Sequence, residues 1–245
     1  MLSLLPSASV LAGLVLVGLF AGVIRGLTGF GAALVIAPGL TLFMSPELAV
    51  PTNMVAICAT NLPLVVGARR EADYHSAGWF FAGSAIALPF GVWLLATLPR
   101  ETLEWAIGLS VIVAALLLAR PKFRLTNVTR PFKVGAGMIA GLMNGSVGMG
   151  GPPVILTLLA SGVPPVTSRA TLIVYFTAMN AVSVAIMAIG GLIDTRILIW
   201  AAIIVPPLAL GQRGGEILFR RGWSNHFRPI AIGLLVATGV VALLH

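Results

Sequence analysis

One arginine and a set of glycines stand inside apolar sequence, where residues that carry chemistry are rare. Residues 22–31 read GVIRGLTGFG and residues 141–150 read GLMNGSVGMG. Both follow the pattern GxxxGxxGxG, and the second begins 119 positions after the first (141 − 22). Arg25 lies inside the first copy and Asn144 occupies the same place in the second. A guanidinium makes two parallel hydrogen bonds to an oxyanion, and an amide can add a third, so the pair predicts an anion site. The alternative is that the segment ends at Arg25 and the side chain reaches the membrane surface.

The glycines of the two motifs have two interpretations of their own. GxxxG commonly allows two membrane helices to pack closely. The tighter part of the motif predicts a break that exposes backbone N–H groups at the start of the next helix, where an anion can bind. The glycines assigned to such a site are Gly29, Gly31, Gly148 and Gly150. Thr28 and Ser146 lie in the same turns, and each hydroxyl either adds a donor to the site or bonds a local carbonyl.

Two asparagines extend the repeat. Asn61 and Asn180 are also 119 positions apart, and each stands in a long apolar segment. An asparagine in a span can bridge two helices, but the symmetric positions favour a place in the site lining. Pro63, together with Thr60, predicts a local break beside Asn61.

The composition is that of a membrane protein. Of the 245 residues, 58% are apolar and 9% are charged, with a mean hydropathy of +1.05, which no soluble domain of this size reaches. A net charge of +8 could suggest nucleic acid, but the basic residues fall in short loops between apolar runs, a pattern of membrane topology. The expected partners are therefore the lipid bilayer and a small anion. The single cysteine, Cys58, excludes an intrachain disulfide.

The elements that must position these residues are ten apolar segments, five in each half of the chain. They fall at 8–24, 30–44, 48–68, 76–98, 102–119, 133–147, 151–162, 170–190, 195–212 and 228–244. The segments 30–44 and 151–162 would form helices of only about 22 and 18 Å, too short for a hydrocarbon core of about 30 Å. Each directly follows a glycine motif, which predicts broken or re-entrant helices there. The sequence thus predicts an all-α membrane fold with a first repeat at 1–119, a basic linker at 120–132 and a second repeat at 133–245.

The distribution of lysine and arginine predicts the orientation. With the N-terminus outside, the outer loops carry two basic residues, Arg100 and Arg196. The inner loops carry twelve: Arg69, Arg70, Arg120, Lys122, Arg124, Arg130, Lys133, Arg169, Arg213, Arg220, Arg221 and Arg228. This bias predicts a multi-pass protein of the cytoplasmic membrane with both termini outside. Because each half has an odd number of segments, the second repeat is expected to be inverted relative to the first.

Several chemistries lack the residues that they need. No Asp or Glu stands in the centre of a segment, which argues against a carboxylate proton relay. No cluster of metal ligands is present, and no cofactor is expected. The stretch around Ser146 faintly resembles the turn of an intramembrane serine protease, but no histidine lies in a segment to activate it. An enzyme is therefore not expected.

With these motifs in view, the chain resembles the TauE/SafE family of sulfite and organosulfonate exporters over essentially its whole length. The matching stretches are GLTGFGAALVIAPGL and GLMNGSVGMGGPPVILTLL, each followed by a short segment and a turn at Pro46 or at Pro164–Pro165. The second motif fits the family pattern better, because Ala32 and Ala33 stand where further glycines are common. The resemblance implies transport of small sulfur-containing anions, usually outward.

Four functions remain to be compared: an alternating-access transporter, a passive anion channel or a carrier of other organic anions, a membrane enzyme, and a structural helix bundle. The last two are disfavoured, because the chain lacks a catalytic pair and carries an arginine in a duplicated glycine break. An anion would leave the cell readily, since an inside-negative potential of 100 mV contributes about 2.3 kcal/mol per charge. The substrate, coupling ion and oligomeric state do not follow from the sequence.

Overall fold

The computed structural model describes residues 7–119 and 128–222, and every regular element within these ranges is a helix. In chain order they are α1 (Ala8–Thr28), α2 (Ala32–Thr41), α3 (Pro46–Ala68), α4 (Tyr74–Thr97), α5 (Arg100–Ala119), α6 (Arg130–Val147), α7 (Gly151–Ala160), α8 (Pro165–Ile189) and α9 (Thr195–Arg220). Five of them, α1, α3, α4, α8 and α9, are long and apolar enough to cross a membrane. The all-helical, membrane-type fold is therefore confirmed. The segment predicted at 228–244 and positions 120–127 of the predicted linker lie outside the described residues.

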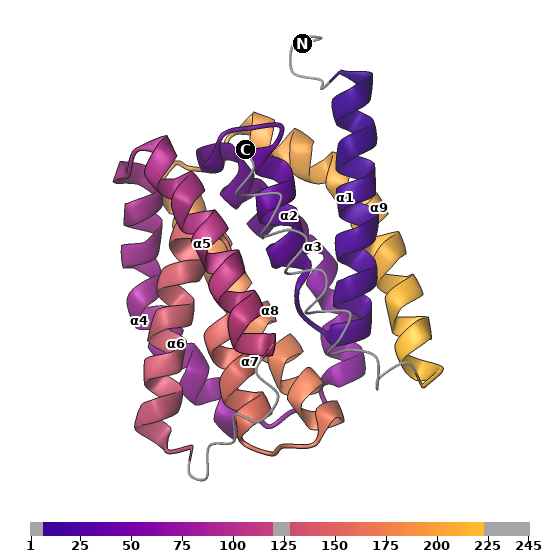
Figure 1. Cartoon of the computed structure of the whole chain (residues 1–245), viewed down its shortest axis with the longest axis vertical. Coiled ribbons are helices and arrows are strands. Elements are labelled where there is room, and N and C mark those ends of the chain that lie inside the picture. The colour runs from indigo at the N-terminus through magenta and orange to yellow at the C-terminus, as the bar shows by residue number, and fades with distance from the viewer. Residues whose placement is uncertain (1–6, 120–127, 223–245) are drawn as a thin grey trace.

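Each glycine motif ends one helix and starts a short one. α1 is followed by the cap residue Gly29 (φ 79°) and α6 by Gly148 (φ 73°), both in a left-handed conformation that favours glycine. The helices that follow, α2 and α7, have 10 residues each, or about 15 Å, somewhat shorter than the sequence predicts. α2 folds back along α1, as the short distance between Gly39 and Val17 shows: a Cβ atom at Gly39 would lie 2.9 Å from the Val17 side chain. The first broken pair is thus a helical hairpin (Figure 1).

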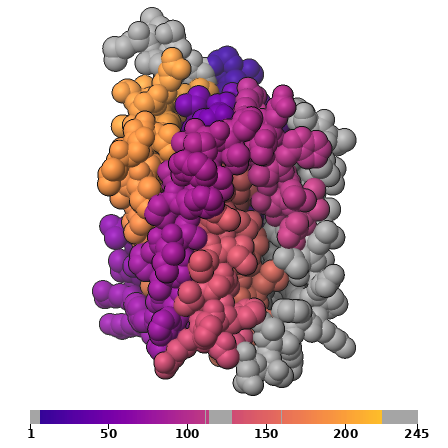
Figure 2. Space-filling model, turned by 90° about the vertical axis from the view of Figure 1, so that its left-hand side faces the viewer, coloured from indigo at the N-terminus to yellow at the C-terminus, as the bar shows by residue number. Residues whose placement is uncertain are grey.

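Closely packed glycines join helices of opposite halves. α1 packs along α9, and α4 packs along α6; Figure 2 shows α4 and α6 side by side on one face. A Cβ atom at Gly26 would lie 2.1 Å from the carbonyl oxygen of Gln212, and one at Gly137 would lie 2.1 Å from that of Phe80. The other glycines with backbone of the partner helix within 3 Å are Gly22, Gly83, Gly91, Gly141, Gly145, Gly211 and Gly215. Glycines of the repeated motif therefore also pack helices, as the GxxxG interpretation predicts.

The corresponding helices of the two halves run in opposite directions where the structure describes them. Figure 1 shows α1 starting at the upper end of the bundle and α6 at the lower end. α3 and α8, which both begin with a proline 119 positions apart, contact each other between the two glycine-packed pairs. The complete arrangement of ten segments in two inverted repeats stays a prediction.

Two predictions about local structure are wrong. α3 continues through Pro63 as a single helix, so there is no break beside Asn61. Seven of the basic residues assigned to loops belong to helices instead: Arg100, Arg130, Lys133, Arg169, Arg196, Arg213 and Arg220. The reason in α8 is that Pro165 starts the helix, since proline suits the first helical turn, and this places Arg169 one turn inside.

The lower end of the bundle is tied together by a polar network around the start of α4. The carboxylate of Asp73 caps this helix and accepts hydrogen bonds from Ser76. The ammonium of Lys133 on α6 donates to Ser76 Oγ at 2.6 Å, and the backbone N–H of Asp73 donates to Thr171 on α8 at 2.9 Å. Although partial burial opposes the shift, the bonds from Ser76 and the charge of Lys133 hold the pKa of Asp73 below its usual value. The network joins α4, α6 and α8.

Candidate functional site

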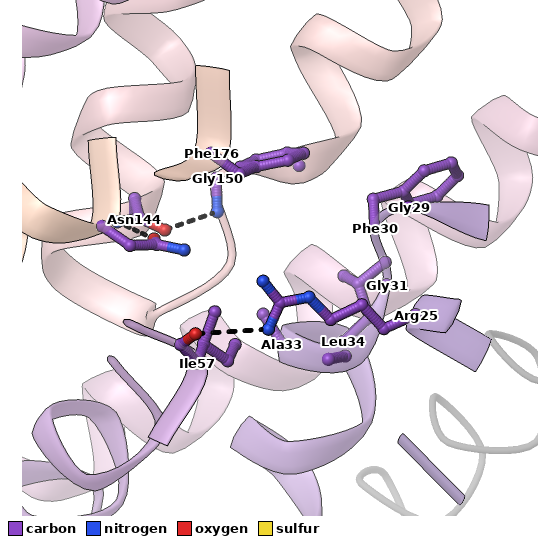
Figure 3. Close-up of a pocket in the computed structure, with 13 residues that line it drawn as sticks. Arg25, Gly29, Phe30, Gly31, Ala33, Leu34, Ile57, Asn144, Gly150 and Phe176 are labelled. Atoms are coloured by element: carbon purple, nitrogen blue, oxygen red, sulfur yellow. Dashed lines mark hydrogen bonds between the residues drawn. The ribbon is translucent and has the colours of Figure 1, made fainter. Parts of the chain in front are cut away.

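The two glycine breaks line one small pocket inside the bundle. Its cavity volume is about 40 Å³, room for about three waters if each needs 10–15 Å³ on this measure. The lining comprises Arg25, Gly29, Phe30, Gly31, Ala32, Ala33, Leu34, Ile57, Asn144, Gly150, Gly151, Phe176 and Asn180. Six of the ten residues that the sequence assigns to a site are therefore brought together: Arg25, Gly29, Gly31, Asn144, Gly150 and Asn180. Figure 3 shows Arg25 reaching into this space toward Asn144 and Gly150.

Arg25 is a buried cation without a carboxylate partner. Only 4% of the residue is exposed. Its Nη1 donates to Thr60 Oγ1 at 3.1 Å and to the carbonyl oxygen of Ile57 at 3.4 Å. The Nε and Nη2 groups have no acceptor among the described residues. A buried charge is costly unless it is paired. The two nitrogens without an acceptor, Nε and Nη2, are therefore available to an anion.

The start of α2 adds backbone donors beside the guanidinium. Gly31 precedes the helix at φ 89°, and no side chain caps this end. The N–H of Leu34 donates to the carbonyl oxygen of Gly31 at 3.1 Å. The N–H groups of Ala32 and Ala33 have no acceptor inside their own helix, and both residues line the pocket. The helix dipole also favours negative charge at this end.

The start of α7 differs from that of α2 for a reason visible in the sequence. Its first residues are Gly151, Pro152 and Pro153, and proline has no backbone N–H. The N–H of Gly150 donates to Asn144 Oδ1 at 3.4 Å. The repeat predicts free backbone N–H groups at the start of both short helices. The structure offers two such groups in a row only at the start of α2.

Asn144 forms the side of the pocket opposite Arg25. Its amide nitrogen donates to Ser183 Oγ at 2.8 Å and lies 3.4 Å from the sulfur of Met54 and 3.5 Å from Asn180 Oδ1. Asn144 and Asn180 are 2% and 4% exposed. These contacts hold the amides in place at the pocket wall.

The remaining four predicted residues do not line the pocket. Thr28 Oγ1 bonds the backbone of Phe30, and Ser146 Oγ donates to the carbonyl oxygen of Leu142 at 2.8 Å, so both hydroxyls take the local alternative. The carbonyl oxygen of Gly148 accepts a hydrogen bond from Asn53 at 3.2 Å. The side chain of Asn61 is buried, and neither of its polar atoms has a partner among the described residues.

Sequence reasoning missed the apolar wall and two polar supports. Phe30, Ile57 and Phe176 line the pocket, and Thr60 and Ser183 hold Arg25 and Asn144. The spacing carried part of this information. Phe176 lies four residues before Asn180 and Ser183 lies three residues after it, which places all three on one face of a helix.

The charges of the lining suit an anion. Among the described residues that line the pocket, Arg25 is the only charged one, and none is a carboxylate. The two ion pairs in the described part of the chain, Arg100–Glu104 and Arg220–Glu216, lie on exposed helix turns. No group of three potential metal ligands occurs within the ranges that the structure describes. The lining thus offers a guanidinium, amides and backbone N–H groups, all of which are hydrogen-bond donors that suit an anion.

Comparison with known proteins gives the family. The model of the family described as "Sulfite exporter TauE/SafE" matches residues 14–242. A protein of Cupriavidus necator (strain H16), named probable sulfite/organosulfonate exporter TauE, is 25% identical over 230 residues, which cover 89% of this chain and 87% of that protein. No solved structure matches the chain. The chain belongs to the TauE/SafE family of multi-pass membrane transporters, and it is not an enzyme.

Proposed function

We propose that this protein exports a small sulfur-containing anion, such as sulfite or an organosulfonate, by alternating access around the pocket between the two glycine breaks. The observation that carries the proposal is the buried guanidinium of Arg25, whose Nε and Nη2 have no acceptor, and which has no carboxylate partner, among the described residues. The name of the Cupriavidus relative supports the substrate class.

In this proposal the anion lies between the two halves. Arg25 binds two oxygens of the sulfite or sulfonate group as a bidentate donor, and the N–H groups of Ala32 and Ala33 contact the same group. Asn144 and Asn180 bound the other side. Phe30, Ile57 and Phe176 exclude water there, which strengthens each charged hydrogen bond. Thr28, Asn61, Ser146 and Gly148 lie outside this lining and contribute only in a conformation that differs from the one described.

The size of the pocket favours a compact anion. A cavity of about 40 Å³ suits an anion of the size of sulfite, which has four non-hydrogen atoms. An organosulfonate with a carbon chain would require the pocket to widen, either at the α1–α2 hairpin or at α7. We therefore propose that sulfite binds more tightly than longer sulfonates.

We further propose that the lower end in Figure 1 faces the cytoplasm. This end carries the α3–α4 connection with Arg69 and Arg70 and the first turn of α6 with Arg130 and Lys133. Basic residues gather on the cytoplasmic side of membrane proteins. The start of α1 would then lie outside, and so would the C-terminus if residues 228–244 form a tenth segment, as the sequence predicts. The membrane potential would drive a bound anion outward.

The test is transport by the purified full-length protein in proteoliposomes. Uptake would be measured for sulfite, short organosulfonates, sulfate and carboxylates under an imposed potential. The proposal expects saturable flux, counter-transport of labelled sulfite, and competition by sulfonates but not by carboxylates. Flux that does not saturate and shows no counter-transport would instead identify a channel. Preference for carboxylates would refute the substrate class.

A further inference from the structure

A second arginine lies directly behind the first glycine break. Arg169 on α8 donates from Nη2 to the carbonyl oxygen of Gly26 at 2.9 Å. Its guanidinium carbon lies 4.4 Å from the ring centre of Phe219 on α9. A Cβ atom at Gly29 would lie 2.7 Å from Arg169 Cγ. Arg169 therefore contacts the end of α1, the break itself and α9.

The carbonyl that accepts this bond lies in the last turn of α1. Carbonyl groups of a final helical turn have no N–H partner in their own helix and carry the negative end of the dipole. A guanidinium from another helix satisfies one of them and places positive charge at this end. Gly26 follows Arg25 directly in the chain, so the hydrogen bond fixes the turn from which the pocket arginine extends.

The second break has a neutral contact in the corresponding place. Gly148, the residue 119 positions after Gly29, would place a Cβ atom 3.4 Å from Val50 and 3.6 Å from Met54. Those two residues stand 119 positions before Arg169 and Ile173, and a Cβ atom at Gly29 would likewise lie 3.2 Å from Ile173. The breaks thus have matching surroundings, except that Arg169 is replaced by a valine.

The second break has a side-chain hydrogen bond at a different carbonyl: the amide of Asn53 donates to the carbonyl oxygen of Gly148, the counterpart of Gly29, at 3.2 Å. One break is therefore held by a cation and the other by an uncharged amide. The guanidinium is anchored on two sides, by the carbonyl and by the Phe219 ring, and cation–π contact adds to the hydrogen bond.

We propose that Arg169 is a positioning residue for the anion site: it fixes the last turn of α1 and thereby the direction in which Arg25 presents its free N–H groups. This inference rests on the proposed function of the pocket. Arg169 does not itself touch the anion. It makes the first break the more firmly held of the two.

A double-mutant cycle in proteoliposomes tests the link to Arg25. Arg169→Gln is expected to raise the sulfite KM about three- to tenfold, within the range of coupling between neighbouring residues, and to leave KM unchanged when Arg25→Gln is already present. Arg169→Lys, which keeps the charge but not the planar stack, should recover part of the loss and serves if the Gln variant folds poorly. An equal increase in KM in both backgrounds, or no increase in either, would overturn the inference.

Amide hydrogen exchange on the full-length protein in detergent tests the same idea without transport. Arg169→Gln should speed exchange at residues 26–34 at least severalfold and leave residues 145–151 unchanged. Asn53→Ala is the matched control, and it should do the reverse. Faster exchange at both breaks in both variants, or at neither, would refute the positioning role. A normal sulfite KM in Arg25→Gln alone would instead refute the proposed site, and the exchange data separate these two failures.

Discussion

Replacing Arg25 is the most direct test of the pocket. The structure leaves Nε and Nη2 of its guanidinium free, while Nη1 already bonds Thr60 and Ile57. A hydrogen bond to a charged group contributes a net of about 1.5–3 kcal/mol. Loss of the charged contact with the anion in Arg25→Ala should therefore weaken affinity about ten- to a hundredfold, at 1.4 kcal/mol per factor of ten.

The lysine variant separates binding from mere placement of a charge. Arg25→Lys keeps the positive charge but lacks the planar fork that can reach two oxygens while a third nitrogen bonds Thr60. We expect it to recover only part of the affinity. An arginine that only extends to the membrane surface would be replaceable by lysine without loss.

The assay is the concentration dependence of sulfite flux in proteoliposomes, together with equilibrium binding in detergent. Binding is needed because KM equals the dissociation constant only when transport is slow relative to release. Arg196→Ala is the control, since this arginine is exposed in the first turn of α9; its affinity should not change. Wild-type affinity in Arg25→Lys, or an equal loss in the Arg196 variant, would refute the reasoning.

Three further predictions concern packing, pH and topology. Gly215→Ala should lower the melting temperature in detergent, because its Cβ atom would lie 2.0 Å from a carbonyl oxygen of α1, and overpacking typically costs about 1–3 kcal/mol. Gly214→Ala is the control, since a Cβ atom there would have nothing within 4 Å, and it should be neutral or slightly stabilising. Equal effects of the two substitutions would contradict the close packing. Asp73→Asn keeps the helix cap but loses the charge. Since the pKa of Asp73 is lowered in the folded protein, wild type should be more stable than the variant above the ordinary carboxyl pKa of about 3.9, and it should lose this advantage as the pH falls below that value. Melting curves between pH 3 and 7 would check this, and a difference that does not change with pH would refute it. In a variant without the native cysteine, a membrane-impermeant thiol reagent applied from outside should label a cysteine at Glu47 and not one at Glu71, and the opposite labelling would reverse the topology.

The repeated motif allowed much of the site to be predicted, because residues at a glycine break in both halves are brought together by the fold. Gly29, Gly31 and Gly150 follow from the motif alone. Asn61 and Asn180 are equivalent in the repeat but differ in the structure, because only Asn180 lines the pocket. In the second half, the short side chain of Asn144 lies near Asn180. In the first half, the counterpart of Asn144 is the longer Arg25, which bonds Thr60 and Ile57 rather than Asn61, and Asn61 is not part of the lining.

Hydropathy could not show that Arg169 belongs to a helix. Hydropathy is averaged over many residues, so a basic residue next to the end of an apolar segment is assigned to the neighbouring loop. The signal that would have corrected this is Pro165, which matches Pro46 at the start of α3. Contacts between distant helices, such as that of Arg169 with Gly26, are set by tertiary packing and leave no trace in local sequence.

The exchange of partners between halves has a consequence for how the chain is made. α1 is synthesised early, but the helix against which its glycines pack, α9, is the last of the described helices to emerge. Contacts between such distant residues form slowly, because the intervening chain must first be closed into a loop. Until α9 is inserted, the glycine face of α1 has no helix to pack against, and the first half alone would lack the neighbour that its most closely packed surface requires. The units that the sequence repeats are not the units that pack, so dividing the gene at the linker would separate two halves that must find each other in the bilayer.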